Sequence, residues 1–445
     1  MDFKEAYQRK LLSIPEAVGL VKSGQSISAA MCASEPVGLL SDLENHAGRL
    51  HNVTVVMCLP MRQYGFYTRP EMAGHFFLEN WFYGAPDRKA HKLGLVSYIP
   101  NNLHQAGADR IRATNGTDIF WGTATPPNSR GIMSLSTSLI FEREMIENAD
   151  LVVLEINEHL PWTLGDTQIS IHDVDYVVEN NAPLVQFPAL EPTEVEDAIG
   201  HYIADLIEDG ATIQLGIGGI PNAIAANLFG KRDLGVHTEM FTDGMVDLYE
   251  AGVVTGKNKT LFPGKMVGGF ALGTDKLYEF VNNNIVVEFQ RGRFTNDPYV
   301  LGQNYKMVSV NTALQVDVIG QVCSQSIGSR HFSGTGGQLD THRGAQRSPG
   351  GRGIIALRSA VKNDTISTIV PQLTPGAEVT VPSQDVDTVV TEYGVAELRG
   401  RSLKDRAAAL ISVAHPDFRD WLQEEVERLG IVPRMVSSGV TLKES

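Results

Sequence analysis

Short apolar segments that alternate with helix-forming stretches are the feature that most constrains how this chain folds. The strand-like segments span residues 53–57, 151–156, 183–187, 285–289 and 388–393. Apolar runs of this length are typical of strands that are buried on both faces, and strands that alternate with helices are typical of parallel sheets. The pattern therefore predicts an α/β fold with mostly parallel sheets.

The two halves of the sequence also resemble each other. Residues 13–43 and residues 193–229 both read as a helix, a glycine, a strand, a loop of small residues and a second helix. The glycine is Gly24 in the first half and Gly210 in the second, and each stands three residues before the isoleucine at the centre of the strand. This repeat predicts two similar α/β domains.

A second pair of segments supports the repeat, because residues 149–157 and 386–394 share Asp, Val-Val and Glu in that order. Between the halves, residues 187–200 carry two prolines and then the acidic start of a helix, which indicates a boundary. We predict an N-terminal domain at 1–190 and a C-terminal domain at 191–445. A cleft between two similar domains is the expected place for a ligand site.

Charge and hydropathy restrict the partners. The net charge of −15, from 37 basic and 52 acidic residues, repels a phosphate backbone, so we expect no nucleic acid partner. No apolar run approaches the roughly 18 residues of a membrane span, and the first residues lack the pattern of a signal or transit peptide. Cys32, Cys58 and Cys323 are odd in number and far apart, which favours reduced thiols. We expect a soluble, cytoplasmic protein without a membrane partner.

Two glycine-rich segments are candidates for ligand-binding loops. Residues 214–225, QLGIGGIPNAIA, follow a predicted strand and open a helix, so their amides can approach an anionic ligand. The spacing does not match the dinucleotide fingerprint, and a tight turn without a ligand is the alternative. Residues 333–340, SGTGGQLD, form the second segment, in which the amides of Gly336 and Gly337 are candidates for an oxyanion hole.

The segment GVHTEMFTDG, residues 235–244, places His237, Glu239 and Asp243 near the end of a predicted strand. Alternation puts His237 and Glu239 on one face, and ligands of parallel sheets bind at the carboxyl ends of strands. A metal site at these three residues lacks the usual ligand frame, so we predict none. A surface carboxylate is the ordinary alternative, but Glu239 lies among apolar residues and between the two glycine segments. A carboxylate there can attack an acyl thioester.

Four motifs, in this order and at these intervals, resemble the acetyl-CoA hydrolase/transferase family, and within it the butyryl-CoA:acetate and 4-hydroxybutyrate CoA-transferases. The motifs are GIGGIP (216–221), HTEMFTDG (237–244), SGTGGQLD with the RGA that follows it (333–345) and VVTEYGVAELRGRS (389–402). The resemblance implies a pair of α/β domains of the CoA-transferase (NagB/RpiA-like) type. It also implies ping-pong transfer of coenzyme A between carboxylic acids.

The resemblance carries roles onto individual residues. It implies that Glu239 forms the thioester with coenzyme A, and that Gly336 and Gly337 form a second segment that binds coenzyme A and the oxyanion. The first CoA-binding loop falls on Gln214, Leu215, Gly216, Ile217 and Gly218. Coenzyme A is then a substrate, and no tightly bound cofactor is implied.

The substrates implied are a short-chain acyl-CoA, butyryl-CoA or 4-hydroxybutyryl-CoA, and a carboxylate such as acetate. The resemblance also implies a homo-oligomer. It supplies no residue of the N-terminal half that binds the substrate carboxylate, and it leaves the acyl group open. Three alternatives remain at this point: an acyl-CoA hydrolase in which water replaces the acceptor, a non-catalytic ligand-sensing protein of the same fold and, as a minor option, a metal-dependent hydrolase.

Overall fold

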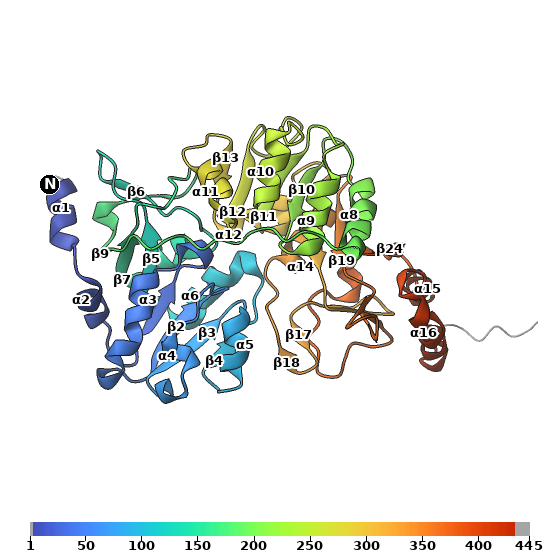
Figure 1. Ribbon diagram of the computed structural model, residues 1–445, viewed down its shortest axis with the longest axis horizontal. Helices are drawn as coiled ribbons and strands as arrows, with labels where there is room; N and C mark the ends of the chain where they lie inside the picture. The colour runs from blue at the N-terminus through green and yellow to red at the C-terminus, as the bar shows by residue number, and fades with distance from the viewer. Residues whose placement is uncertain (1–2, 432–445) are drawn as a thin grey trace, which may run out of the picture.

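The computed structural model describes residues 3–431 and shows two lobes side by side (Figure 1). Residues 1–2 and 432–445, at the outer ends of the two predicted domains, lie outside the described residues. We call residues 3–179 the first lobe and residues 194–431 the second lobe. Each lobe is built around one large sheet.

The sheet of the first lobe has seven strands, and every neighbouring pair in it is parallel. Its strands, in spatial order, are β4 (Val96–Tyr98), β3 (Phe76–Asn80), β2 (Val53–Met57), β1 (Ser26–Ala29), β5 (Thr117–Ala124), β7 (Ala149–Ile156) and β9 (Tyr176–Glu179). Most of their side chains are buried, as the apolar runs predicted.

The sheet of the second lobe has eight strands, and only its last pair, β23 with β24, is antiparallel. Its strands, in spatial order, are β13 (Val287–Phe289), β12 (Met266–Ala271), β11 (Gly235–Phe241), β10 (Thr212–Leu215), β14 (Met307–Thr312), β19 (Arg352–Ala356), β23 (Thr388–Thr391) and β24 (Gly394–Glu397). Residues 388–393, predicted as one strand, thus form β23 and the turn into β24.

The two sheets share one strand order, since the first strand of each lies in the middle, the next three extend to one side and the later ones to the other. Gly24 and Gly210 precede β1 and β10 with φ of +80° and +76°, a backbone conformation that glycine adopts without a steric cost. The predicted duplication of an α/β unit is confirmed.

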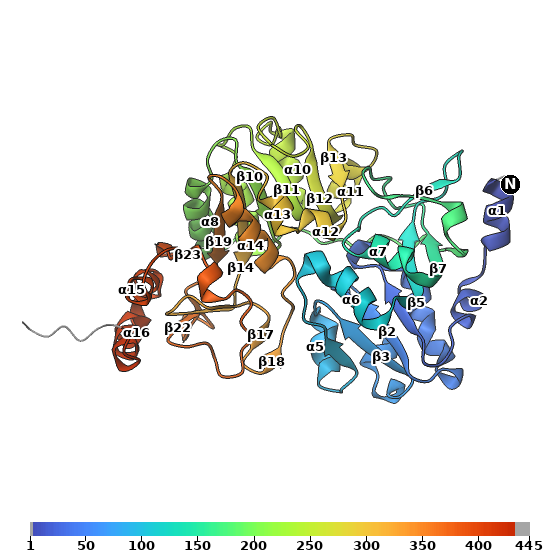
Figure 2. The ribbon, with the colours of Figure 1, turned by 180° about the vertical axis from the view of Figure 1, so that it is seen from behind.

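Helices connect the parallel strands and cover the faces of both sheets, seen from the front in Figure 1 and from behind in Figure 2. Those of the first lobe are α1 (Phe3–Lys10), α2 (Ile14–Gly19), α3 (Val37–Asp42), α4 (Gly65–Thr68), α5 (Ala85–His91), α6 (Ala106–Thr114) and α7 (Glu142–Glu147). Those of the second lobe are α8 (Glu194–Leu206), α9 (Gly219–Asn227), α10 (Asp243–Glu250), α11 (Asp275–Val281), α12 (Gly292–Thr295), α13 (Pro298–Leu301), α14 (Gln338–Arg347), α15 (Leu403–Val413) and α16 (Pro416–Arg428). Among the described helices, none is long and apolar enough to span a bilayer.

Short strands outside the two large sheets belong mainly to the loops around them. They are β6 (Ile132–Ser134), β8 (Gln168–Ser170), β15 (Gln315–Asp317), β16 (Val322–Cys323), β17 (Ser326–Ile327), β18 (Arg330–His331), β20 (Ala360–Val361), β21 (Ile366–Ser367) and β22 (Ile369–Val370). The hairpin of β17 and β18 lies beside α5 of the first lobe in both views (Figures 1 and 2). The second lobe therefore reaches the first through this loop region as well.

Two sequence predictions about strands are wrong. Residues 183–187 form no strand, because Pro183 cannot donate to a ladder and the amide of Phe187 instead donates to Gly273 O at 2.8 Å. The predicted correspondence between residues 149–157 and residues 386–394 in the two repeats is also wrong. These residues form β7 and β23, and β7 is the sixth strand of its sheet whereas β23 is the seventh. In strand order β7 corresponds to β19, and a Val-Val centre with polar ends is common to many buried strands.

The lobes give a physical basis for the domain boundary. The last strand of the first sheet ends at Glu179 and the first strand of the second begins at Thr212. Helix α8 begins with a capping box, in which Thr193 Oγ1 accepts from Glu196 N and Glu196 Oε2 accepts from Thr193 N. We propose that the lobes are the domains predicted at 1–190 and 191–445.

Candidate active site

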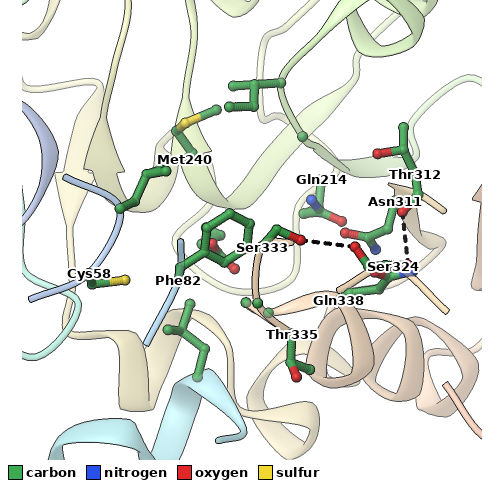
Figure 3. Close-up of a pocket in the computed structure, with 18 of the residues that line it drawn as sticks. Cys58, Phe82, Gln214, Met240, Asn311, Thr312, Ser324, Ser333, Thr335 and Gln338 are labelled. Atoms are coloured by element: carbon green, nitrogen blue, oxygen red, sulfur yellow. Dashed lines mark hydrogen bonds between the residues drawn. The ribbon is translucent and has the colours of Figure 1, made fainter. Parts of the chain in front are cut away.

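A pocket of about 300 Å³ lies between the lobes, at the carboxyl ends of strands from both sheets (Figure 3). This is where open parallel sheets bind ligands. Seven of the eight residues singled out from the sequence line it: Gln214, Leu215, Gly216, Ile217, Glu239, Gly336 and Gly337. The eighth, Gly218, lines an adjacent cavity on the other side of Ile217. Tertiary structure thus brings both glycine segments to the candidate carboxylate.

Glu239 lies near the carboxyl end of β11, and its carboxylate has two polar partners. Asn296 Nδ2 donates to Glu239 Oε2 at 2.8 Å, and the backbone amide of Gly337 donates to the same carboxylate. Burial raises the pKa of Glu239 to about 7, and the neighbouring charge of Asp340 contributes to the rise. A carboxylate that is buried, oriented and ionised near neutral pH is suited to act as a nucleophile.

Gly337 approaches the carboxylate so closely that a side chain at this position would displace the groups around it. A Cβ atom built on Gly337 would lie 2.0 Å from both Glu239 Oε2 and Asn296 Nδ2, far inside van der Waals contact. The absence of a side chain is what allows the amide of Gly337 to reach the carboxylate. The second glycine segment is therefore part of the site and not only a flexible loop.

Asn296 is a site residue that sequence reasoning missed. It follows α12 directly, is fully buried, and its Oδ1 accepts from Thr295 Oγ1 at 3.0 Å. This leaves its Nδ2 free to point at Glu239, which is 57 residues earlier in the chain. The segment RFTNDP carries no motif that would have singled out this asparagine, since its role arises from packing alone.

His237 and Asp243 do not join Glu239 in a shared cluster. The buried ring of His237 donates from Nε2 to Thr295 O at 3.1 Å and accepts from Asn304 Nδ2 at 3.2 Å, and burial lowers its pKa to about 3. Asp243 accepts from the amide of Thr274 at the start of α11. Within residues 3–431, no group of three His, Cys, Asp or Glu side chains is arranged to hold a metal ion.

The glycine loop after β10 rests on a buried polar network from β14 and α14. Ser309 Oγ donates to Gln214 Oε1 at 2.9 Å, and Asn311 Nδ2 donates to Ser309 Oγ and Thr341 Oγ1 at 2.9 and 3.0 Å. Gln338 also lies at this side of the pocket, and its buried Nε2 has no hydrogen-bond partner among the described residues. An unsatisfied buried donor beside a pocket is ready to bind a ligand oxygen.

The second glycine segment is anchored on the first lobe. The Tyr98 hydroxyl of β4 lies 3.1 Å from Thr335 Oγ1 and accepts from the amide of Thr335 at 3.1 Å. The amide of Tyr83 donates to Ser333 O at 3.0 Å. These contacts hold residues 333–337 across the boundary between the lobes, so the pocket depends on both lobes at once.

Comparison with known proteins matches both parts of the chain to the same family. The family model described as the acetyl-CoA hydrolase/transferase N-terminal domain matches residues 1–188, and the model of the C-terminal domain matches residues 273–426. The 4-hydroxybutyrate coenzyme A transferase of Clostridium kluyveri is 41% identical, over 96% of this chain and all of the relative. The succinyl-CoA:cyclohexane-1-carboxylate CoA transferase of Geobacter metallireducens is 40% identical, over 96% of this chain and 97% of the relative.

Among solved structures, the crystal structure of RipA from Yersinia pestis superposes with a TM-score of 0.90. It is 34% identical, and the alignment covers 97% of this chain and all of RipA. The two named relatives are almost equally similar to this chain, yet their names give different substrates. Overall similarity therefore does not determine which acyl group this chain would bind.

Proposed function

Because the chain belongs to the acetyl-CoA hydrolase/transferase family, we propose that this enzyme moves coenzyme A from a short-chain acyl-CoA to a carboxylate. The donor is butyryl-CoA or 4-hydroxybutyryl-CoA, and the acceptor is a carboxylate such as acetate. Coenzyme A is a substrate here and not a resident cofactor. A homo-oligomer, a cytoplasmic location and the absence of a nucleic acid partner stay predictions.

The observation that supports this function best is the Glu239 carboxylate, held by Asn296 and by the amide of Gly337 at the wall of the pocket. In the first half-reaction Glu239 attacks the thioester carbonyl, and coenzyme A leaves as a thiolate. The product is a mixed anhydride of the acyl group and Glu239. The thiolate then attacks the glutamyl carbonyl, which releases the acyl group as a free carboxylate and leaves coenzyme A as a thioester of Glu239.

The second half-reaction runs these steps in reverse with the acceptor. The incoming carboxylate attacks the glutamyl thioester and expels the thiolate, and the thiolate attacks the acyl carbonyl of the new anhydride. This releases the new acyl-CoA and the free Glu239 carboxylate. Each attack creates an oxyanion, and the amides of Gly336 and Gly337 are the donors we assign to it. Residues 214–218 are the loop we assign to coenzyme A.

Trapping the thioester tests this proposal directly. We expect the protein, incubated with butyryl-CoA and without acceptor, to be inactivated by borohydride, because borohydride reduces an enzyme thioester to an alcohol. Peptide mass spectrometry should locate the corresponding loss of mass on Glu239. Butyrate should be released up to one equivalent per site and free coenzyme A should not accumulate, since continued release of either product would indicate hydrolysis.

The matched control is the same incubation with free coenzyme A and butyrate in place of the thioester. This mixture supplies the same components without an activated acyl group, so borohydride should leave activity and peptide masses unchanged. Reduction at a different residue in the first experiment would exclude Glu239 as the nucleophile.

The pH dependence should report the ionisation of Glu239. Burial raises its pKa to about 7, so below that pH the carboxyl is protonated and cannot attack. We expect kcat/KM for the acyl-CoA to rise with pH up to about 7 and then to level off. In Asn296→Ala the midpoint of this pH profile should move to higher pH. The hydrogen bond from Asn296 stabilises the ionised carboxylate, so its loss raises the pKa of Glu239. A profile that is flat between pH 5 and 8 would argue against a titrating nucleophile in this range.

A further inference from the structure

The first lobe contributes only apolar side chains to the pocket. They are Met31, Cys58, Leu59, Phe82 and Leu103, from loops at the carboxyl ends of its strands and before α6. Figure 3 shows Cys58 and Phe82 on the same side of the pocket as Met240 of the second lobe. Among the described residues that line the pocket, none is Lys, Arg or His. This half of the pocket therefore has no group that could neutralise an anion.

The polar side chains gather on the opposite side. Figure 3 shows Gln214, Asn311, Thr312 and Gln338 there, all from the second lobe. Side-chain amides and hydroxyls complement the amide groups of a pantetheine arm, and the unpartnered Nε2 of Gln338 is a donor for a carbonyl oxygen. If the pantetheine arm of the acyl-CoA lies on this side and its thioester carbonyl lies at Glu239, the acyl group of the substrate points toward the first lobe.

The duplicated fold explains why an apolar group faces Glu239. The strand register pairs Ile27 with Val55 in the first sheet and Ile213 with Val236 in the second. Three residues further on, the second lobe has the candidate nucleophile, whereas the first lobe has Cys58. Both line the same pocket. At equivalent positions of the two sheets, the first lobe thus has an apolar residue of the pocket wall, Cys58, and the second lobe has the candidate nucleophile, Glu239.

We propose that Cys58, Leu59, Phe82 and Leu103 form an acyl wall that selects a short, uncharged, unsubstituted aliphatic acyl group. This inference rests on the proposed CoA transfer and names its substrate class. An apolar wall gains free energy by covering methylene groups and gives a hydroxyl group no partner. The volume of about 300 Å³ is small for a ligand site and must also hold the thioester, which favours a short chain.

Charge argues against a dicarboxylic acyl group such as succinyl. Its second carboxylate would point at the acyl wall, where no basic side chain lies. The pKa of the Cys58 thiol is raised by burial first and then by the nearby carboxylates of Glu239 and Glu142, so the charged groups around this wall are acidic. A carboxylate there would lose its hydration without gaining a counter-charge.

Leu59 is the residue of the wall whose position is most constrained. Its φ of +45° lies in the left-handed region, which is rare for a leucine and typical of functional sites when it occurs. Its amide donates to Phe82 O at 2.9 Å, which ties the loops after β2 and β3 together. Because glycine suits this backbone better than leucine, Leu59→Gly is expected to fold and to open the wall.

The test measures kcat/KM of the full-length protein for acetyl-, butyryl-, 4-hydroxybutyryl- and succinyl-CoA, with isotopically labelled acetate as acceptor. We expect butyryl-CoA to exceed 4-hydroxybutyryl-CoA by about 10-fold and succinyl-CoA by on the order of 10³-fold. In Leu59→Gly the preference for butyryl-CoA over acetyl-CoA should fall by about 10-fold, because the methylene groups lose their contact.

Gln338→Leu is the matched variant on the polar side. It should raise KM for all four donors alike and leave their ratios unchanged, because every donor carries the same pantetheine arm. The acyl wall is contradicted if kcat/KM for succinyl-CoA equals that for butyryl-CoA. It is also contradicted if the butyryl-to-acetyl ratio of kcat/KM is unchanged in Leu59→Gly. Neither result would contradict the proposed CoA transfer. A protein that transfers coenzyme A from none of the four donors overturns the proposed function as well.

Discussion

Replacement of Glu239 with Gln is expected to lower kcat for CoA transfer by on the order of 10⁵-fold, as the loss of a covalent nucleophile does in other enzymes. The amide is nearly isosteric and can still accept from Asn296 Nδ2, so the pocket should keep its shape. It cannot form the anhydride, because a neutral amide is a very weak nucleophile. Steady-state transfer from butyryl-CoA to labelled acetate measures the effect.

The thermal unfolding of the same variant shows whether activity is lost because the nucleophile is missing or because the fold is destabilised. Burial raises the pKa of Glu239 to about 7, which means that the folded protein pays for holding an ionised carboxylate at higher pH. The neutral Gln removes this cost, so the Tm of Glu239→Gln at pH 8 should equal or exceed that of the unmodified protein. A variant that melts normally and retains more than a few per cent of the activity would exclude Glu239 as the nucleophile.

The second large effect is expected from Gly337→Ala. The added Cβ would lie 2.0 Å from Glu239 Oε2 and from Asn296 Nδ2, so the loop, the carboxylate or the asparagine must move. Because an oxyanion donor acts only at a defined position, we expect kcat to fall by about 10³-fold. The trapped thioester on Glu239 should form more slowly by a similar factor in a single-turnover experiment.

Gly230→Ala is the matched control for that variant. Gly230 follows α9 in the same lobe, and a Cβ there meets no atom within 4 Å. The substitution should leave transfer and Tm nearly unchanged. If Gly337→Ala is as active as Gly230→Ala, the amide of Gly337 has no part in catalysis.

Local patterns accounted for much of this fold. Buried strands such as 53–57 were recognisable because a strand buried on both faces must be apolar throughout its length. The repeat was recognisable because Gly24 and Gly210 satisfy the same backbone requirement before β1 and β10. The same reasoning failed at 183–187, where an apolar run is a connection between the lobes, because periodicity does not report whether a neighbouring strand is present.

The candidate site was predictable only in part. Glu239 and the two glycine segments could be singled out, since a carboxylate after a strand and glycines before helices are local features. Asn296 could not, because its contact with Glu239 spans 57 residues and depends on how α12 packs against β11. Leu59 could not either, because its left-handed backbone and its place in the pocket follow from the loops after β2 and β3.

The sequence by itself determined the α/β class, the duplicated unit and the carboxylate on which the proposed chemistry rests. These properties depend on side chains within a few residues of one another, whose spacing is written in the chain. Only the tertiary structure decided that Gly337 and Asn296 meet at Glu239, and that the first lobe faces them with an apolar wall. These contacts join residues that are far apart in the chain, and the packing of two whole sheets decides which of them come within reach.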